Sequence, residues 1–214
     1  MLGGNASAVI LLGLLWTICF VFFAHLRREQ FLASLLAGIF FPTLYWYGHI
    51  TGDPTIPPGP LHALFLFFSG GLASICYHVI FGQYYLRVRQ FKSRTHEQSW
   101  VWQMLALTFI AAWIMVLFGY MWPHMSGGII MTLTALCFLL YYTAYRQDLL
   151  FDAVMSAFLM LILFASVDLV LSGPDFDTLP ADFYLQAFGL GLFFGPLYEF
   201  TRNLHLQHVP FRLQ

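Results

Sequence analysis

The sequence has few charged side chains. Asp, Glu, Lys and Arg make up 9% of its 214 residues, whereas about a quarter of the residues in soluble domains are charged. Hydrophobic residues account for 60%, the mean hydropathy is +0.75, and there are 24 Phe, 11 Tyr and 6 Trp. A water-facing surface cannot accommodate so many apolar and aromatic side chains. We therefore expect an integral membrane protein that contacts membrane lipid and has no nucleic-acid partner.

Cysteine and histidine pairs with metal-binding spacing are also lacking. Cys19, Cys76 and Cys137 each lie in an apolar stretch, and none belongs to a CxxC motif. This pattern indicates neither a disulfide framework nor a zinc site. No two histidines lie four residues apart within one apolar stretch, so no haem, metal or other cofactor is expected.

Seven apolar stretches approach the length of about 20 residues that a membrane span needs. They occupy residues 8–26, 31–49, 61–86, 99–121, 126–145, 150–172 and 182–203. All nine basic residues follow the first, third, fifth or seventh stretch: Arg27, Arg28, Arg87, Arg89, Lys92, Arg94, Arg146, Arg202 and Arg212. The positive-inside rule then places the N-terminus outside and the C-terminus in the cytoplasm. The expected fold is an all-α bundle of seven transmembrane helices, and a bacterial inner membrane is the expected location.

The chain aligns with itself. Residues 50–81 match residues 171–202 without a gap, Gly70 falls on Gly191, and both segments begin with an outer loop that contains Pro and Asp. Such a pattern is typical of a parallel repeat related by an axis along the membrane normal. We expect a single domain with one three-span repeat over about residues 8–86, a linking span at 99–121, a second repeat over about 126–203 and a short cytoplasmic tail at 204–214.

Three ionisable side chains lie well inside predicted spans: His78, Asp168 and Glu199. Such groups are costly in a bilayer and often mark a site. The self-alignment pairs His78 with Glu199, and a tyrosine precedes each, so we hypothesise that they face each other across a pseudo-two-fold axis. Burial would favour a neutral, proton-donating Glu199. The alternatives are a pair with Arg202 or a side chain that reaches the cytoplasmic surface.

His78 and Asp168 can also be explained by structural roles alone. A neutral His78 bound to a backbone carbonyl and an interfacial Asp168 are the simpler interpretations of those two residues. Four further groups lie near span ends and are expected to reach the interface: His25, His62, Asp152 and Asp182.

Glycines recur in the third and seventh spans, as SGG at 69–71 and as Gly189, Gly191 and Gly195 beside Pro196. Glycine lets helices approach closely, and a proline removes a backbone hydrogen bond. The pattern fits either a pocket beside Glu199 or a groove for helix packing.

The stretch SVDLVLSG, followed by LPADFY, resembles the membrane lycopene cyclases of the heterodimeric or fused bacterial and fungal type. That family has an acidic residue late in one span and a Pro-x-acidic motif at the start of the next. The resemblance covers about residues 150–203, and the acidic pair of the family is here Asp182 followed by Phe183.

The resemblance implies related architecture and an isoprenoid-like substrate that undergoes acid-catalysed cyclisation or isomerisation. Asp182, assisted by Glu199 or Asp168, would protonate a terminal double bond. Aromatic rings would stabilise the resulting cation. The substrate-binding residues implied are His78, Tyr77, Tyr198, Phe188 and Phe67.

Other functions fit the same pattern of spans. A plan of three, one and three spans also resembles sugar transporters of the SWEET type, although their Pro-Gln pair is absent. A small-solute or proton-coupled transporter would use His78 and Glu199 as a central gate or proton site. The seventh span has no lysine, which excludes a retinal Schiff base there. A non-catalytic accessory subunit is the third alternative, and the residues leave open whether the chain is an enzyme or forms homo- or hetero-oligomers.

Overall fold

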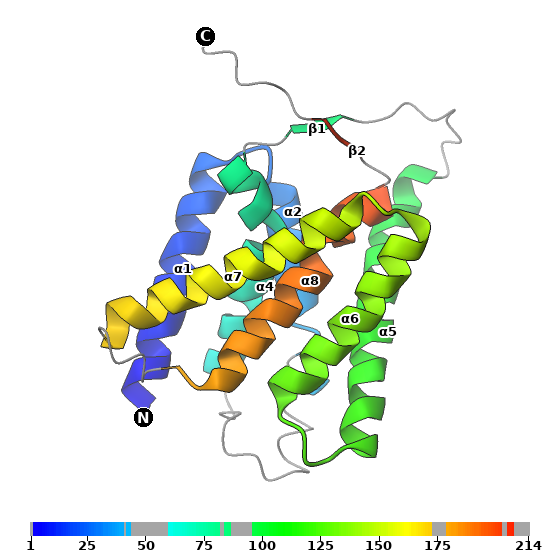
Figure 1. Cartoon of the computed structure of the whole chain (residues 1–214). Coiled ribbons are helices and arrows are strands. Elements are labelled where there is room, and N and C mark those ends of the chain that lie inside the picture. Colours follow the sequence, from blue (N-terminus) through cyan, green and yellow to red (C-terminus); the bar gives the residue numbers. More distant parts are fainter. Residues whose placement is uncertain are drawn as a thin grey trace.

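The computed structural model of the chain describes residues 2–40, 42–43, 60–81, 84–86, 96–172, 179–202 and 205–207. Within these residues the protein is a helical bundle (Figure 1). Its helices are α1 (Leu2–Phe22), α2 (Arg27–Ala37), α4 (Pro60–Phe81), α5 (His96–Met121), α6 (Gly127–Tyr145), α7 (Leu149–Ser172) and α8 (Ala181–Arg202).

Two short strands accompany the helices. β1 (Tyr84–Leu86) pairs antiparallel with β2 (His205–Gln207), so a segment of the expected cytoplasmic tail lies beside the end of the first half of the chain. The expected third span, 61–86, is therefore wrong at its end, because α4 stops at Phe81. The sequence Tyr84–Leu86 consists of two tyrosines and a leucine, and aromatic side chains favour strands.

α5, α6, α7 and α8 follow the predicted spans closely, whereas α2 and α4 end earlier than the corresponding spans. Among the described helices, four are long and apolar enough to cross a membrane: α4, the Trp100–Met121 part of α5, α6 and α7. The apolar part of α1, Ala6–Phe22, is shorter. The second predicted span, 31–49, begins within α2, and its residues 44–49 lie outside the described part of the chain.

Large apolar side chains cover the outer faces of the long helices. Trp113 of α5 is 66% exposed and Val170 of α7 is 73% exposed. Exposed apolar surface of this kind marks contact with a partner or a membrane. Together with the four long apolar helices, it indicates a protein embedded in a membrane.

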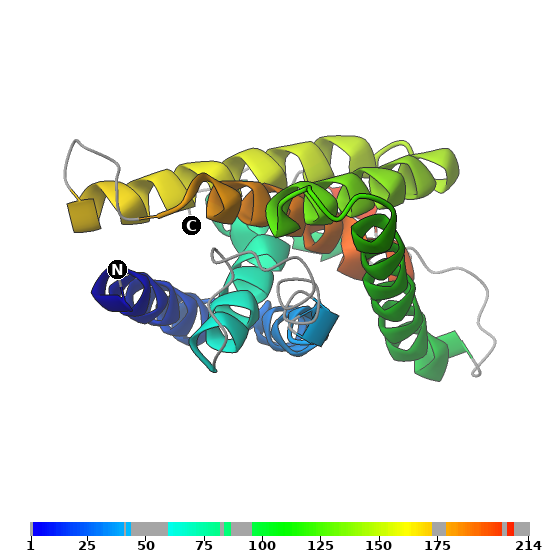
Figure 2. The ribbon, with the colours of Figure 1, turned by 90° about the horizontal axis from the view of Figure 1, so that it is seen from below.

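Helix α8 lies in the middle of the bundle. It packs against α7, α6 and α4 (Figures 1 and 2), and 16 of its 22 residues are buried. Its polar side chains Asp182, Gln186 and Glu199 are among the buried ones. These polar groups make α8 less apolar than its neighbours. They do not face lipid, because the neighbouring helices cover them.

Glycines allow the closest approaches between helices. A Cβ atom on Gly191 would lie 2.5 Å from Cα of Ala157, which joins α8 to α7. A Cβ on Gly70 would meet Ala37, which joins α4 to α2. The predicted packing role of these glycines is confirmed.

Replacing Gly191 with alanine should destabilise the bundle. The new methyl group meets backbone atoms of Ala157 that cannot rotate away, and such overpacking costs roughly 1–3 kcal/mol. The matched control is Gly13→Ala, whose Cβ would meet only the ring of Phe68, at 3.1 Å. We expect Gly191→Ala to lower the thermal unfolding temperature in detergent while Gly13→Ala leaves it unchanged or raises it. Equal unfolding temperatures for the two variants would contradict this packing role.

Candidate functional site

Three buried ionisable side chains meet where α4, α7 and α8 end together. His78 lies three residues before the end of α4, Asp152 three residues after the start of α7, and Glu199 three residues before the end of α8. Their exposed fractions are 2%, 2% and 1%. Since a helix rises about 1.5 Å per residue, each lies roughly 5 Å inside its helix end. We call these three residues the acid–imidazole cluster.

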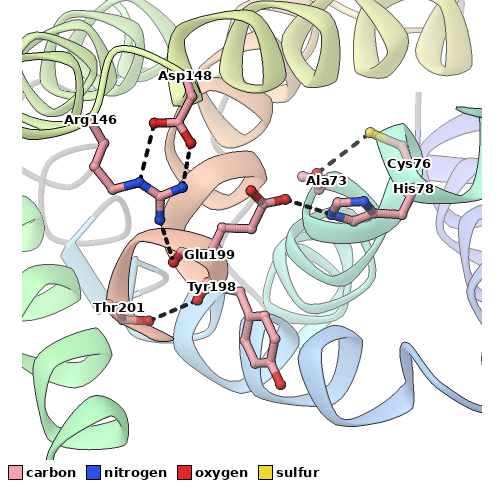
Figure 3. A network of polar contacts seen from close by, with 8 residues as sticks. All are labelled: Ala73, Cys76, His78, Arg146, Asp148, Tyr198, Glu199 and Thr201. Atoms are coloured by element: carbon pink, nitrogen blue, oxygen red, sulfur yellow. Dashed lines mark hydrogen bonds and ion pairs between the residues drawn. The ribbon is translucent and has the colours of Figure 1, made fainter. Parts of the chain in front are cut away.

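One contact in the cluster joins α4 to α8, and thus the first half of the chain to the second. Nε2 of His78 lies 3.2 Å from Oε1 of Glu199, and Figure 3 shows the carboxyl of Glu199 directed at the imidazole. The predicted meeting of these two side chains is therefore confirmed. One donor atom from each of His78, Asp152 and Glu199 lies within 4.8 Å of the other two.

Arg146 holds the end of α8 beside the cluster. Its Nη1 donates to the backbone carbonyl of Glu199 at 3.1 Å, and its Nε and Nη2 donate to the carboxylate of Asp148 at 3.2 and 2.5 Å (Figure 3). Such a two-point arginine–carboxylate pair is well oriented. The positive charge nearest the cluster is thus matched by Asp148.

The two carboxyl groups of the cluster lack hydrogen-bond donors. Among the described residues, none donates to either carboxyl oxygen of Asp152 or of Glu199 by hydrogen-bond geometry. These two carboxyl groups lie close enough to interact with each other. Two buried carboxylates side by side repel each other and are costly to desolvate. The cluster therefore needs a proton or a cation to balance its charge.

Two expectations about this region are wrong. Asp152, expected to reach the membrane interface, is instead buried, because α4 and α8 cover the start of α7. Glu199 neither pairs with Arg202 nor reaches the surface. Arg202 instead donates to the hydroxyl of Tyr198 and lies over the ring of Trp100. Sequence spacing does not reveal the cluster, because its members come from three separate helices.

The other two predicted acids make structural hydrogen bonds at the opposite ends of their helices. Asp168 accepts from the hydroxyl of Tyr184 and, at 3.3 Å, from the backbone N–H of Leu179. Asp182 accepts from the backbone N–H of Gly128 at 2.7 Å and from the side chain of Gln186 at 2.8 Å. Both acids are buried, which for Asp182 is again contrary to the expected interfacial position.

The predicted catalytic acids do not form one site. Asp182 and Glu199 lie 17 residues apart on the single helix α8, which corresponds to about 25 Å. Asp168 is similarly distant from Asp152 along α7. Glu199 is the one acid of the predicted trio that lies in the cluster.

The predicted substrate-binding aromatics are also spread over the bundle. Tyr77 stacks near Phe81 and Phe151, and Tyr198 packs on Trp100. Two of them lie far from the cluster along their helices: Phe188 packs against Phe158, and Phe67 against Trp16 and Phe68. The structure does not bring these rings together around Glu199.

A wide apolar groove lies elsewhere, between α2 with the residues after it and α5. Its volume is about 580 Å³. Its lining residues are Leu35, Gly38, Ile39, Pro42, Thr43, Phe109, Ala112, Trp113 and Val116. None of the described residues that line this groove is titratable, so these residues can hold a hydrocarbon but supply no acid.

Comparison with known proteins adds no assignment. No protein family, no curated protein and no solved structure matches the chain.

The structural role of Asp182 can be tested by two substitutions. Asp182→Ala leaves the buried N–H of Gly128 without its acceptor, which costs about 1–3 kcal/mol, whereas Asp182→Asn keeps an oxygen at that position. We expect the alanine variant to unfold at a lower temperature in detergent and the asparagine variant to stay close to the wild type. An asparagine variant as unstable as the alanine variant would show that the negative charge, rather than the hydrogen bond, is required.

Proposed function

We propose that the chain is a membrane carrier for a small solute. Its two halves would be α1, α2 and α4 on one side and α6, α7 and α8 on the other, with α5 linking them. The observation that carries the proposal is the His78–Glu199 contact, which joins the third helix of one half to the third helix of the other. In a carrier built from repeats, the halves move against each other around such a central contact.

The packing within each half supports a repeat. α4 packs on α1 and α2, and α8 packs on α6 and α7. The aligned glycines Gly70 and Gly191 occupy corresponding interfaces, the first against Ala37 of α2 and the second against Ala157 of α7. Equivalent close approaches at aligned positions are what a duplicated three-helix unit would produce.

The arginines support the proposed orientation. Arg28, at the start of α2, and Arg202, at the end of α8, both lie over the ring of Trp100, at 4.8 and 5.2 Å from its centre. Arg146 contacts the end of α8 near the cluster. The described basic residues of these segments thus gather at one end, which we propose to be cytoplasmic. The seven spans and the bacterial inner membrane stay predictions.

In this scheme the acid–imidazole cluster is a gate at the cytoplasmic end. The His78–Glu199 contact would hold α4 against α8 and close that end. Opening would require the contact to break, and the two exposed partners would then be solvated. The His78–Glu199 contact is close enough to stabilise the closed state. It involves only two side chains, so water can replace it in the open state.

Uptake into proteoliposomes tests the carrier. The probes are labelled hexoses, amino acids and Zn²⁺, each compared with vesicles that lack protein. We expect one probe class to enter faster in the presence of the protein and this uptake to fall at least tenfold in Glu199→Gln, because the gate loses its imidazole partner. The matched control is Asp168→Asn, a buried acid about 24 Å from the cluster along its helix. Unchanged uptake in Glu199→Gln, or no uptake of any probe, contradicts the proposal.

A second candidate is an enzyme or accessory protein that binds an isoprenoid-like hydrocarbon. The observation that favours it is the apolar groove of about 580 Å³ between α2 and α5. A cavity of this size and lining suits a hydrocarbon ligand. Acid catalysis would have to come from another site, since no acid lines the groove.

Filling the groove tests this second candidate. Ala112 lines the groove and is 6% exposed, so Ala112→Trp should displace a bound hydrocarbon. Mass spectrometry of lipid extracts from the purified protein should detect an isoprenoid in the wild type and at least several-fold less in the variant. Leu140→Trp, at an outer position that is 71% exposed, is the control. Equal isoprenoid content in all three proteins, or none in the wild type, excludes the groove as the binding site.

A further inference from the structure

The acid–imidazole cluster has the composition of a metal site. Imidazole nitrogen and carboxylate oxygen are both ligands for zinc and related transition metals. The three side chains come from three different helices, and one donor atom of each lies within 4.8 Å of the other two. Small rotations of these side chains would bring all three donor atoms around one ion.

The distance between His78 and Glu199 suits two ligands of a tetrahedral ion. Zn²⁺ binds nitrogen and oxygen at about 2.0–2.2 Å, so two ligands of one tetrahedral ion lie roughly 3.3 Å apart. Nε2 of His78 and Oε1 of Glu199 are 3.2 Å apart. Asp152 would complete three protein ligands and leave a fourth position open, which is the arrangement of many non-structural zinc sites.

The charges call for a divalent cation. Asp152 and Glu199 carry two negative charges when both are ionised, and apart from each other their carboxyl groups have no hydrogen-bond partner among the described residues. Among the described residues, Arg146 is the arginine that interacts with both carboxyl groups, and its guanidinium is paired with Asp148. One divalent ion would therefore cancel the charge of the cluster without leaving an excess in the apolar interior.

We propose that His78, Asp152 and Glu199 together bind one divalent transition-metal ion of the zinc class. The ion bridges α4, α7 and α8 and thereby ties the two halves of the chain together. Mg²⁺ and Ca²⁺ are not the preferred ions for this site, because they are coordinated by a larger number of donors, all of them oxygen atoms. The binding site itself is independent of the carrier proposal; only its effect on transport rests on that proposal.

Metal binding is measured on the full-length protein in detergent. The histidines of the C-terminal segment are first replaced, as His205→Ala and His208→Ala, so that they cannot contribute additional zinc binding. After removal of metal by a chelator, the protein is titrated with Zn²⁺ against a chromophoric competitor, and bound metal is counted by mass spectrometry. We expect one Zn²⁺ per chain and no competition by excess Mg²⁺.

Substitutions assign the ligands. His78→Gln, Asp152→Asn and Glu199→Gln should each weaken Zn²⁺ binding by at least about tenfold, whereas Asp168→Asn should not. Zn²⁺ should also raise the unfolding temperature of the wild type but not that of Glu199→Gln. Each protein is compared with itself, with and without Zn²⁺, so the variants need not be equally stable. Absence of stoichiometric Zn²⁺ in the wild type overturns the proposal and leaves shared protons to balance the cluster. Wild-type affinity in all three ligand variants overturns it as well.

The outcomes separate the two proposals. Zn²⁺ binding without uptake of any solute keeps the metal site and rejects the carrier. Uptake of a hexose or an amino acid without Zn²⁺ binding keeps the carrier and rejects the metal site. If both proposals hold and Zn²⁺ is not the solute carried, Zn²⁺ should slow uptake in the wild type, since a metal bridge between α4 and α8 keeps the gate closed.

Discussion

Two carboxyl groups and an imidazole share a small volume from which water is excluded, and the rest of the architecture supports that arrangement. Each carboxylate would be strongly destabilised there without a compensating charge or hydrogen bond. His78 supplies a partner for Glu199 at 3.2 Å, and Arg146 fixes the backbone of Glu199 from the other side while it pairs with Asp148. Both His78 and Arg146 also interact electrostatically with Asp152, which is buried beside Glu199. A buried ionisable group is costly in a membrane protein, which is consistent with the bound ion and the moving contact that we propose for this cluster.

Close packing makes this cluster possible. Asp152 and Glu199 can meet only if α7 and α8 approach closely along their length, and Gly191 and Gly195 remove the Cβ atoms that would hold the helices apart. The packing of α4 on α2 through Gly70 serves the same purpose in the other half. In a lipid environment, where the hydrophobic effect does not drive helices together, close contact of small residues is a main source of association. The ionisable residues therefore depend on the glycines, whose close helix contacts bring them together.

Much of this could be predicted from the sequence, and the rest could not for physical reasons. Apolar length alone located the helices to within a few residues for α5, α6, α7 and α8, because a span must satisfy its backbone hydrogen bonds internally. The hypothesis that His78 and Glu199 face each other agrees with their contact at 3.2 Å, while the repeat that suggested it stays a prediction. Asp152 was missed because its position near a helix end says nothing about which neighbours cover it, and that depends on the tertiary packing of α4 and α8. The strands β1 and β2 were missed because strand pairing between distant segments leaves no periodic signal in three residues.

The two ends of α8 show why position on a helix does not determine the role of an acid. Asp182 and Glu199 are carboxyl groups on the same buried helix, and an inference from sequence alone treats both as candidates for acid catalysis. At the first end, Asp182 accepts hydrogen bonds from Gly128 and Gln186, so it is suited to hold the start of α6 against α8. At the other end, Glu199 faces an imidazole and a second carboxyl and receives no hydrogen bond from the described residues. A carboxyl group that receives its hydrogen bonds from the protein itself has a structural role. A carboxyl group that still requires a proton or an ion to balance its charge can respond to its surroundings. That difference, rather than the residue type, is the reason why we propose the functional centre at the His78 end of α4 and not at the start of α8.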